Sequence, residues 1–242
     1  MPIPIRLYDI PNKHGKAWSP NLLKAMYTLN YKQIPYERIW TEYPDIENTS
    51  KSINALPTTI KNGKPLYTLP AIHDPNTGIT IADSIQIAEY LDKTYPNPER
   101  MVVPPGTGAL QRAFLEVFSA KVIPPLLQLL MSRTAGSLNP RSEEYFRRNK
   151  PYTEVELIGE ERKEVWNQVE EAYGVLDSWL RKEDRYFMRD KVSFADLQVA
   201  GSLVWMREIL GEESDEWKSV CAWHDGRWGR LVKDLEVYER LT

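Results

Sequence analysis

The sequence of 242 residues has little of several features that would narrow its function directly. It holds a single cysteine, Cys221, which excludes an intramolecular disulfide and a cysteine-rich zinc site. Lys and Arg number 31 against 34 Asp and Glu, so no strong basic field is present to gather the phosphates of a nucleic acid. No apolar run approaches the roughly 20 residues that span a membrane, and the amino terminus lacks the basic and apolar regions of a secretory signal. These absences predict a cytoplasmic protein without a nucleic-acid, membrane or metal partner.

The composition that is present is typical of a folded protein. Hydrophobic residues make up 42% and charged residues 27%, and the length suits one large domain or two modest ones. Aromatic residues are prominent, with 8 Trp in the chain. Six of these lie between Trp166 and Trp228, where packing is the expected role, whereas Trp18 lies close to the polar motifs described below.

The first 96 residues alternate strand and helix signals. Ile3, Ile5 and Leu7 alternate with less apolar residues, which predicts a strand, and Ser19-Pro20 is typical of a helix start. Further turns and apolar alternation predict, in order, a strand over 36–43, a turn at Asn62-Gly63, a strand over 66–73, a strand from 79 and a helix opening at Asp83-Ser84.

The remainder of the chain reads as helices. Residues 97–108 are rich in Pro and Gly, so we expect a linker there between domains at 1–96 and 109–242. Pro124-Pro125 should end or kink the first helix of the second domain. A long helix is expected over 160–181, and Ser193 with Asp196 predicts a capping box that starts another helix.

Three polar motifs each allow a structural and a functional interpretation. Ser19 is an ordinary helix cap, or a hydroxyl at the positive end of a helix where an anion is favoured. Pro70 marks an edge strand, or it is cis and turns the backbone of Leu69 toward an extended ligand. Asp83 caps a helix, or with Ser84 it binds the ammonium and carboxylate of an amino acid.

The order of these motifs resembles that of the cytosolic glutathione transferases over essentially the whole chain. The segments that carry the resemblance are IRLYDI, WSPN, YTLPAIHD, IADSIQIAEYLDKTYP and VSFADLQVAG. The resemblance implies a thioredoxin-like N-terminal domain with a mixed four-stranded sheet, an all-helical C-terminal domain and a homodimer. The pattern is most similar to the serine-type branch, which holds fungal transferases related to bacterial lignin β-etherases.

The resemblance also implies roles for residues of the first domain. Ser19 would donate its hydroxyl to the glutathione sulfur, with Asn21 also in reach and Tyr8 as the alternative activator. The remaining glutathione contacts would come from Thr68, Leu69 and a cis Pro70 for the cysteinyl backbone, Asp83 and Ser84 for the γ-glutamyl end, and Lys64 or Lys51 for the glycyl carboxylate.

A second, hydrophobic substrate would bind between the domains. Trp18, Phe114, Phe118 and Val122 are the expected lining residues, and core packing is the alternative for the last three. The implied activity is conjugation of glutathione, the co-substrate, to aromatic electrophiles in detoxification, with cleavage of β-aryl ethers as a related reaction. The alternative is a carrier of aromatic or phenolic compounds with little turnover.

Overall fold

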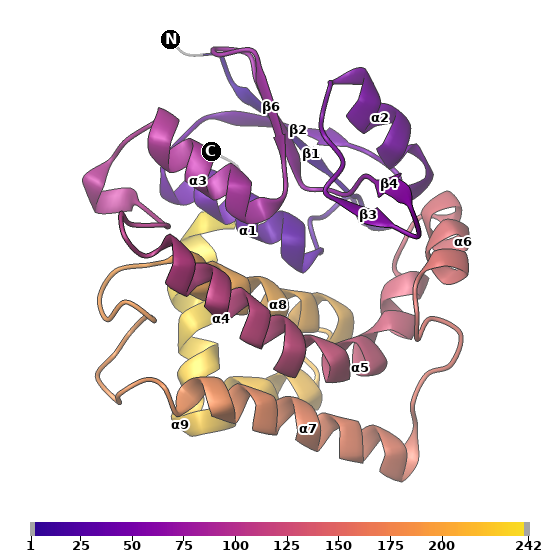
Figure 1. Cartoon of the computed structure of the whole chain (residues 1–242). Coiled ribbons are helices and arrows are strands. Elements are labelled where there is room, and N and C mark those ends of the chain that lie inside the picture. The colour runs from indigo at the N-terminus through magenta and orange to yellow at the C-terminus, as the bar shows by residue number, and fades with distance from the viewer. Residues whose placement is uncertain (1–2, 240–242) are drawn as a thin grey trace.

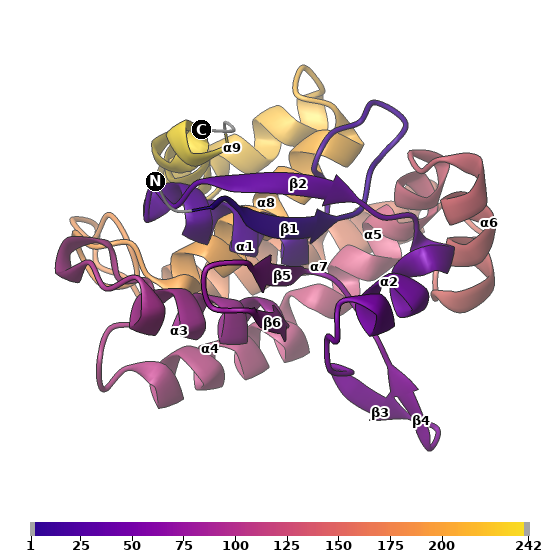
Figure 2. The ribbon, with the colours of Figure 1, turned by 90° about the horizontal axis from the view of Figure 1, so that it is seen from above.

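A four-stranded mixed sheet organises the first domain of the computed structural model, which describes residues 3–239. The strand order is β2-β1-β5-β6, with β1 parallel to β2 and antiparallel to β5, and β5 antiparallel to β6 (Figure 2). The strands are β1 (Ile5–Asp9), β2 (Tyr36–Trp40), β5 (Ala71–Asp74) and β6 (Ile79–Ala82). The helices of this domain are α1 (Pro20–Tyr31), α2 (Ile46–Ser52) and α3 (Ser84–Thr94), of which α1 and α3 separate the sheet from the second domain (Figure 1).

Two of the strands expected in the first domain have other bounds than predicted. The strand expected over 66–73 is split, because Leu66 ends a hairpin strand and β5 begins only at Ala71. Pro70 has no N–H to give to a ladder and lies just outside the sheet. The hairpin consists of β3 (Thr59–Lys61) and β4 (Lys64–Leu66) around the expected Asn62-Gly63 turn, where both residues have positive φ. Likewise β2 ends at Trp40, and residues 43–45 form a short 3₁₀ turn, η1 (Tyr43–Asp45).

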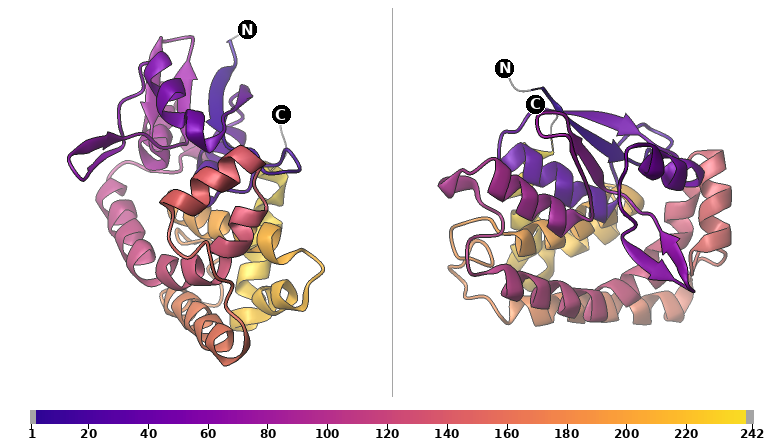
Figure 3. Two further views of the ribbon diagram at one scale, coloured as in Figure 1. Left: turned by 90° about the vertical axis from the view of Figure 1, so that its right-hand side faces the viewer. Right: turned by 45° about the horizontal axis from the view of Figure 1, so that its top comes forward.

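The second domain is helical. After η2 (Pro98–Arg100) it runs through α4 (Gly108–Lys121), α5 (Ile123–Gly136), α6 (Pro140–Asn149), α7 (Gly159–Asp177), α8 (Phe194–Leu210), α9 (Asp215–Leu235) and η3 (Glu236–Tyr238). The axes of α4 and α5 are bent by 60° at the break between Lys121 and Ile123, and Pro124-Pro125 lie in the first turn of α5, as expected of prolines that end one helix and start the next. Figure 1 and Figure 3 show α7 at the end of the helical domain that is farther from the sheet.

The long helix α7 ends four residues earlier than expected. It stops at Asp177, and Trp179 beyond it is 48% exposed rather than buried. The following turn is held by Arg227 of α9, which pairs with Asp177 and donates to the carbonyl oxygens of Arg181 and Asp184. This contact comes from a segment about 50 residues away, so the local apolar spacing contains no sign of it.

Helix α8 is the centre of the molecule. All of its residues from Phe194 to Met206 are buried, and it contacts α1, α4, α5 and α9. Its first turn has the expected capping box: the Asp196 carboxylate accepts hydrogen bonds from the backbone and the hydroxyl of Ser193 at 2.8 and 2.7 Å. The mixed sheet domain followed by a helical domain confirms the expected fold class.

Candidate functional site

Three predicted segments meet at one edge of the sheet. Tyr8, near the end of β1, pairs with Ala71 at the start of β5, and Ala71 pairs with Ala82 at the end of β6. The chain therefore enters β5 and leaves both β1 and β6 at the same edge. Since β1 and β2 are parallel with α1 between them in the chain, α1 also begins at this edge. The starts of α1, β5 and α3 are thus brought together.

Ser19 lies at the N-cap of α1 but does not cap it with its side chain. Its carbonyl oxygen accepts the first helical bond from Leu23, whereas no described hydrogen bond uses its hydroxyl. The residue is 7% exposed, yet the hydroxyl oxygen is not sealed from solvent. The hydroxyl is therefore available to a ligand at the positive end of a 12-residue helix.

The Leu69-Pro70 peptide bond is cis, as the functional interpretation of Pro70 expected. The Pro70 carbonyl accepts a hydrogen bond from the backbone of Asp83 at 3.2 Å, which ties this segment to the start of α3. Among the described residues, none pairs with the N–H or the C=O of Leu69. Both backbone groups thus remain available beside the strand edge, in the arrangement that an extended peptide recognises.

Asp83 and Ser84 share capping and ligand-facing features. Asp83 has a left-handed φ of 79° and accepts a hydrogen bond from the backbone of Gln86 at 3.2 Å with one carboxylate oxygen. Ser84 is 6% exposed, and within the described chain its hydroxyl has no hydrogen-bond partner. The cap occupies one oxygen of Asp83, so the other oxygen and the Ser84 hydroxyl can face a zwitterion.

The other polar residues predicted to bind glutathione are exposed or make hydrogen bonds within the protein. The Thr68 hydroxyl is bonded to Thr58 at 3.0 Å, and Asn21 is exposed on the first turn of α1. Lys64 is exposed on the β3–β4 hairpin. Lys51 lies 5.5 Å from the centre of the Tyr67 ring and pairs with Glu47, so it is held beside the segment that leads to Leu69.

The predicted hydrophobic lining is mostly core. Phe118 and Val122 have no exposed surface, so they cannot contact a ligand without moving, and the core-packing alternative describes them correctly. Phe114 is half-buried and lies in an aromatic cluster with Phe118, Trp179 and Phe187. Trp18 is 3% exposed and packs edge-on against Phe146. Its indole N–H is a buried donor with no partner among the described residues, directly before Ser19.

Tyr8, the alternative activator, is 6% exposed in β1. Burial, the largest effect, raises the pKa of its phenol above the usual value. The phenol therefore stays protonated and able to donate, and its position beside Ala71 puts it at the same sheet edge as Ser19. The choice between the two hydroxyls depends on the experiment described below.

Two buried charged groups near this edge were not anticipated from the sequence. Asp9, at the end of β1, lies 3.4 Å from the guanidinium of Arg38, and burial raises its pKa to about 6 against the lowering effect of Arg38. Lys24 is 6% exposed within α1. The burial of Lys24 could have been predicted from the sequence, because α1 is apolar on nearly all of its faces and a charged residue within such a helix must be buried.

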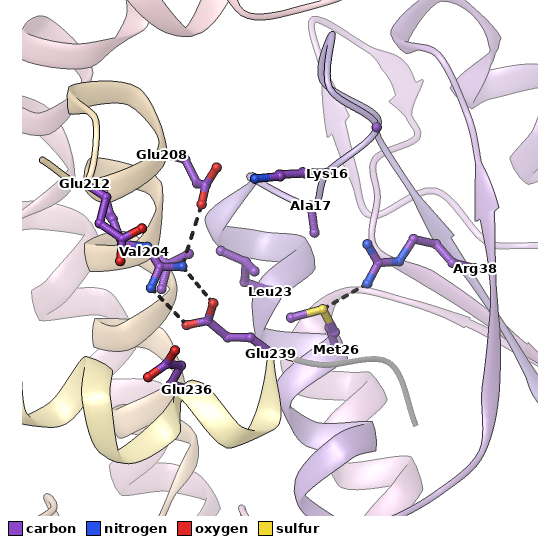
Figure 4. Close-up of a pocket in the computed structure, with 12 residues that line it drawn as sticks. Lys16, Ala17, Leu23, Met26, Arg38, Val204, Glu208, Glu212, Glu236 and Glu239 are labelled. Atoms are coloured by element: carbon purple, nitrogen blue, oxygen red, sulfur yellow. Dashed lines mark hydrogen bonds and ion pairs between the residues drawn. The ribbon is translucent and has the colours of Figure 1, made fainter.

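A separate hollow of about 430 Å³ lies between α1, β2, α8 and the C-terminal segment (Figure 4). Arg207 is held there by Glu239 at 2.7 Å and by Glu208 at 3.6 Å, above an apolar floor that includes Leu23 and Met26. None of the predicted site residues lines it. It is therefore distinct from the sheet edge that holds Ser19.

Residues 3–239 contain no group of three or more His, Cys, Asp or Glu side chains placed to hold a metal ion. In the same range no one helix has both the length and the apolar character of a membrane span, although the bent pair α4 and α5 meets those criteria when its two halves are taken together.

A thioredoxin-like domain with a mixed sheet, joined to a helical domain, is the fold of the glutathione transferases. Two family models match the chain, the N-terminal domain of glutathione S-transferase over residues 18–94 and its C-terminal domain over residues 109–238. The protein belongs to the glutathione S-transferase family.

Individual relatives agree with this assignment. A glutathione S-transferase of Ceriporiopsis subvermispora, crystallised in complex with glutathione, is 42% identical, with 99% of each chain covered and a TM-score of 0.93. Glutathione transferase GSTFuA3 of Phanerochaete chrysosporium is 38% identical over the whole of both chains, with a TM-score of 0.91. The glutathione S-transferase-like protein ustS of Aspergillus flavus is 28% identical, with 93% of this chain and 92% of that protein covered.

Proposed function

We propose that this protein is a serine-type glutathione transferase that activates the thiol of glutathione for attack on hydrophobic aromatic electrophiles. One observation carries the proposal: the Ser19 hydroxyl, the Leu69 backbone and the Ser84 hydroxyl meet at one sheet edge, and each is without a hydrogen-bond partner among the described residues. The 42% identical relative crystallised with glutathione supports the choice of ligand.

The proposed contacts follow the shape of the tripeptide. The Leu69 N–H and C=O pair with the cysteinyl backbone, Asp83 takes the γ-glutamyl ammonium, and Ser84 with the start of α3 takes the γ-glutamyl carboxylate. This places the sulfur toward Ser19 at the start of α1. Lys51 or Lys64 is proposed for the glycyl carboxylate, and Lys51 is favoured because it is held against Tyr67.

The energies required of Ser19 are modest. A thiol with a pKa of about 8.5 is only a few per cent thiolate at neutral pH, and lowering this pKa by roughly 2 units takes about 2.7 kcal/mol. A hydrogen bond to a charged acceptor contributes roughly 1.5–3 kcal/mol, and the helix end adds about 0.3–1 kcal/mol. Ser19 and α1 together are sufficient without a metal ion or a general base.

The transfer itself needs only the activated sulfur. The thiol proton passes to solvent when the thiolate forms, and the sulfur lone pair then makes a C–S bond to the electrophilic carbon. A leaving group such as chloride, or the aryloxide of a β-aryl ether, departs with its bonding pair. Phe114 is the proposed contact of the aromatic group, because it is half-buried, whereas Trp18, Phe118 and Val122 are buried in the core.

The test compares turnover with binding. We expect retention of the protein on immobilised glutathione and turnover of a chlorinated aromatic compound or a β-aryl ether in the presence of glutathione. Displacement of a fluorescent aromatic dye is measured in parallel. Tight dye binding with no reaction of any electrophile would contradict transferase activity and favour the carrier function. No retention on immobilised glutathione would contradict the proposal that the protein binds glutathione. A homodimer and a cytoplasmic location remain part of the same proposal.

A further inference from the structure

The hollow of about 430 Å³ beside α1 has the volume of a small-molecule site, and none of the residues proposed to contact glutathione lines it. Leu23 and Met26 of α1 form an apolar floor. In Figure 4 four glutamates lie to the left of this floor, whereas Lys16 lies above it and Arg38 to its right. The hollow therefore has an acidic side and a basic side, with apolar surface between them.

The acidic side holds more negative charge than the protein neutralises. Arg207 pairs with Glu239 at 2.7 Å and lies 3.6 Å from Glu208. Glu212 and Glu236 are exposed, and neither carboxylate forms an ion pair or a hydrogen bond with any residue in the range 3–239. One guanidinium is thus set against four carboxylates, so this side attracts a cation such as an ammonium group.

The basic side holds a guanidinium whose N–H groups are only weakly satisfied. The Arg38 side chain is 10% exposed and lies 4.9 Å from the centre of the Trp40 ring. Its Nε is buried without a hydrogen-bond partner among the described residues, at 3.4 Å from the Asp9 carboxylate, and a terminal nitrogen donates to the sulfur of Met26 at 3.0 Å. A thioether accepts weakly, whereas a carboxylate matches the planar guanidinium with two hydrogen bonds. Lys16, which is exposed and has no ion pair within the described chain, adds a second positive charge, so this side suits a carboxylate.

We propose that this hollow is a second ligand site, which binds a zwitterion whose ammonium and carboxylate are separated by an apolar chain. The ammonium lies among the glutamates, the chain covers Leu23 and Met26, and the carboxylate accepts hydrogen bonds from Arg38 and Lys16. The site does not depend on the proposed glutathione site, because α1 offers its N-terminal Ser19 to one and its Leu23 and Met26 to the other.

The two sides also select against other charge patterns. A ligand with carboxylates at both ends would place one of them beside the unpaired Glu212 and Glu236. A ligand with ammonium groups at both ends would place one beside Arg38 and Lys16. Because like charges in contact oppose binding, the hollow favours one charge of each sign over two of either sign.

Calorimetric titration with linear amino acids of increasing length tests the proposal. The probes are 4-aminobutanoate, 6-aminohexanoate and 8-aminooctanoate, each compared with the alkyl carboxylate and the alkylamine of the same chain length. We expect at least one of the three to bind about fivefold more tightly than both of its singly charged counterparts, a modest factor because exposed charges are screened by water. The same affinity is expected with and without excess S-methylglutathione, since the two ligands occupy different sites.

Variants of the acidic side test the ammonium contact. Replacement of both Glu212→Gln and Glu236→Gln alters exposed side chains, so the fold is retained. It should weaken the amino acid about fivefold and leave the alkyl carboxylate no weaker than before. Glu213→Gln is the matched control, because Glu213 is adjacent in the chain but does not line the hollow and lies 3.6 Å from Lys218.

A variant of the basic side tests the carboxylate contact. Arg38→Met is made together with Asp9→Asn, so that no buried carboxylate is left without its counter-charge. Relative to Asp9→Asn alone, the double variant should bind both the amino acid and the alkyl carboxylate about tenfold more weakly, the loss of one charged hydrogen-bonding group.

Three results would overturn the second site while leaving the glutathione site in place. They are failure of all three amino acids to bind, equal affinity of an amino acid and its singly charged counterparts, and displacement of the bound amino acid by S-methylglutathione. Unchanged affinity in both the glutamate and the Arg38 variants would do the same. Failure of S-methylglutathione to bind would instead contradict the proposed function and leave the second site untouched.

Discussion

Ser19 is the residue on which the proposed chemistry depends. Its backbone serves the helix while its hydroxyl does not, which separates the structural role of the residue from the functional one. A serine that merely capped α1 would direct its side-chain oxygen to the second or third N–H of the helix. The hydroxyl here has no such bond, so substitution should affect a bound thiolate more than the fold.

We predict that Ser19→Ala raises the pKa of enzyme-bound glutathione by about 1–2 units, because one hydrogen bond to a charged sulfur is lost. The ultraviolet absorbance of the thiolate, followed against pH, measures this directly. Tyr8→Phe is the matched control, since it removes the competing hydroxyl from the same sheet edge. If Tyr8→Phe shifts the titration and Ser19→Ala does not, the two roles are exchanged.

At the level of elements, the position of Ser19 depends on how closely α1 approaches α8. A Cβ placed on Gly201 of α8 would lie 2.8 Å from the backbone carbonyl oxygen of Pro20, which cannot move without moving the start of α1. The glycine therefore lets the end of α1 that carries Ser19 rest directly on the central helix of the other domain.

Gly201→Ala should displace the start of α1 and cost about 1–3 kcal/mol of unfolding free energy, the usual range for overpacking. Chemical denaturation measures this cost, and turnover with glutathione should fall with it. Gly136→Ala, at the end of α5, is the control, because a Cβ there meets no atom within 4 Å. Equal stabilities of the two variants would show that α1 can shift without strain.

Capping and proline signals determine other elements locally. The box formed by Ser193 and Asp196 places the start of α8, and the Asp196 carboxylate also accepts from the backbone of Phe187 at 2.9 Å. Burial raises the pKa of this carboxyl to about 6 in spite of these bonds. The cap that the sequence shows as a local motif is thus also a tertiary contact.

For the molecule as a whole, buried carboxylates give stability an unusual pH dependence. Burial raises the pKa of Asp9 from 3.8 to about 6. Well below pH 3.8 this group is protonated in both the folded and the unfolded state and has no effect on stability. Between pH 3.8 and about 6 the unfolded state loses this proton while the folded state keeps it, so the free energy of unfolding falls as the pH rises. Above pH 6 the carboxyl is ionised in both states, and the destabilisation has reached its full size.

We therefore predict that Asp9→Asn becomes more stable relative to the wild type as the pH rises from 4 to 7, by about 3 kcal/mol, the equivalent of the 2-unit shift. Denaturant unfolding at a series of pH values gives this difference. Asn retains the oxygen that accepts from the backbone of Ile10 at 2.7 Å. Asp190→Asn, at an exposed position, controls for the change in net charge. A difference that stays constant with pH would contradict the burial argument.

Much of the architecture could be predicted from short-range patterns. Alternation in β1, the helix starts at Ser19, Asp83 and Ser193, and the bend next to Pro124-Pro125 each depend on groups within about four residues of one another. The hairpin around Asn62-Gly63 and the early end of α7 were only partly anticipated, because residues far along the chain decide where those segments lie.

The sequence by itself determined the order of β1, α1, β2, β5, β6 and α3, the change from a sheet domain to a helical one, and the motifs that the family shares, since capping, proline geometry and apolar spacing act locally. Only the tertiary structure decided which side chains those motifs face. It buried Phe118 and Val122 in the core and placed Lys24 against α8, and it left the Ser19 hydroxyl and the Leu69 backbone without hydrogen-bond partners among residues 3–239. The burial of a side chain and its hydrogen-bond partners depend on which distant element packs against it, and no local sequence pattern contains that information.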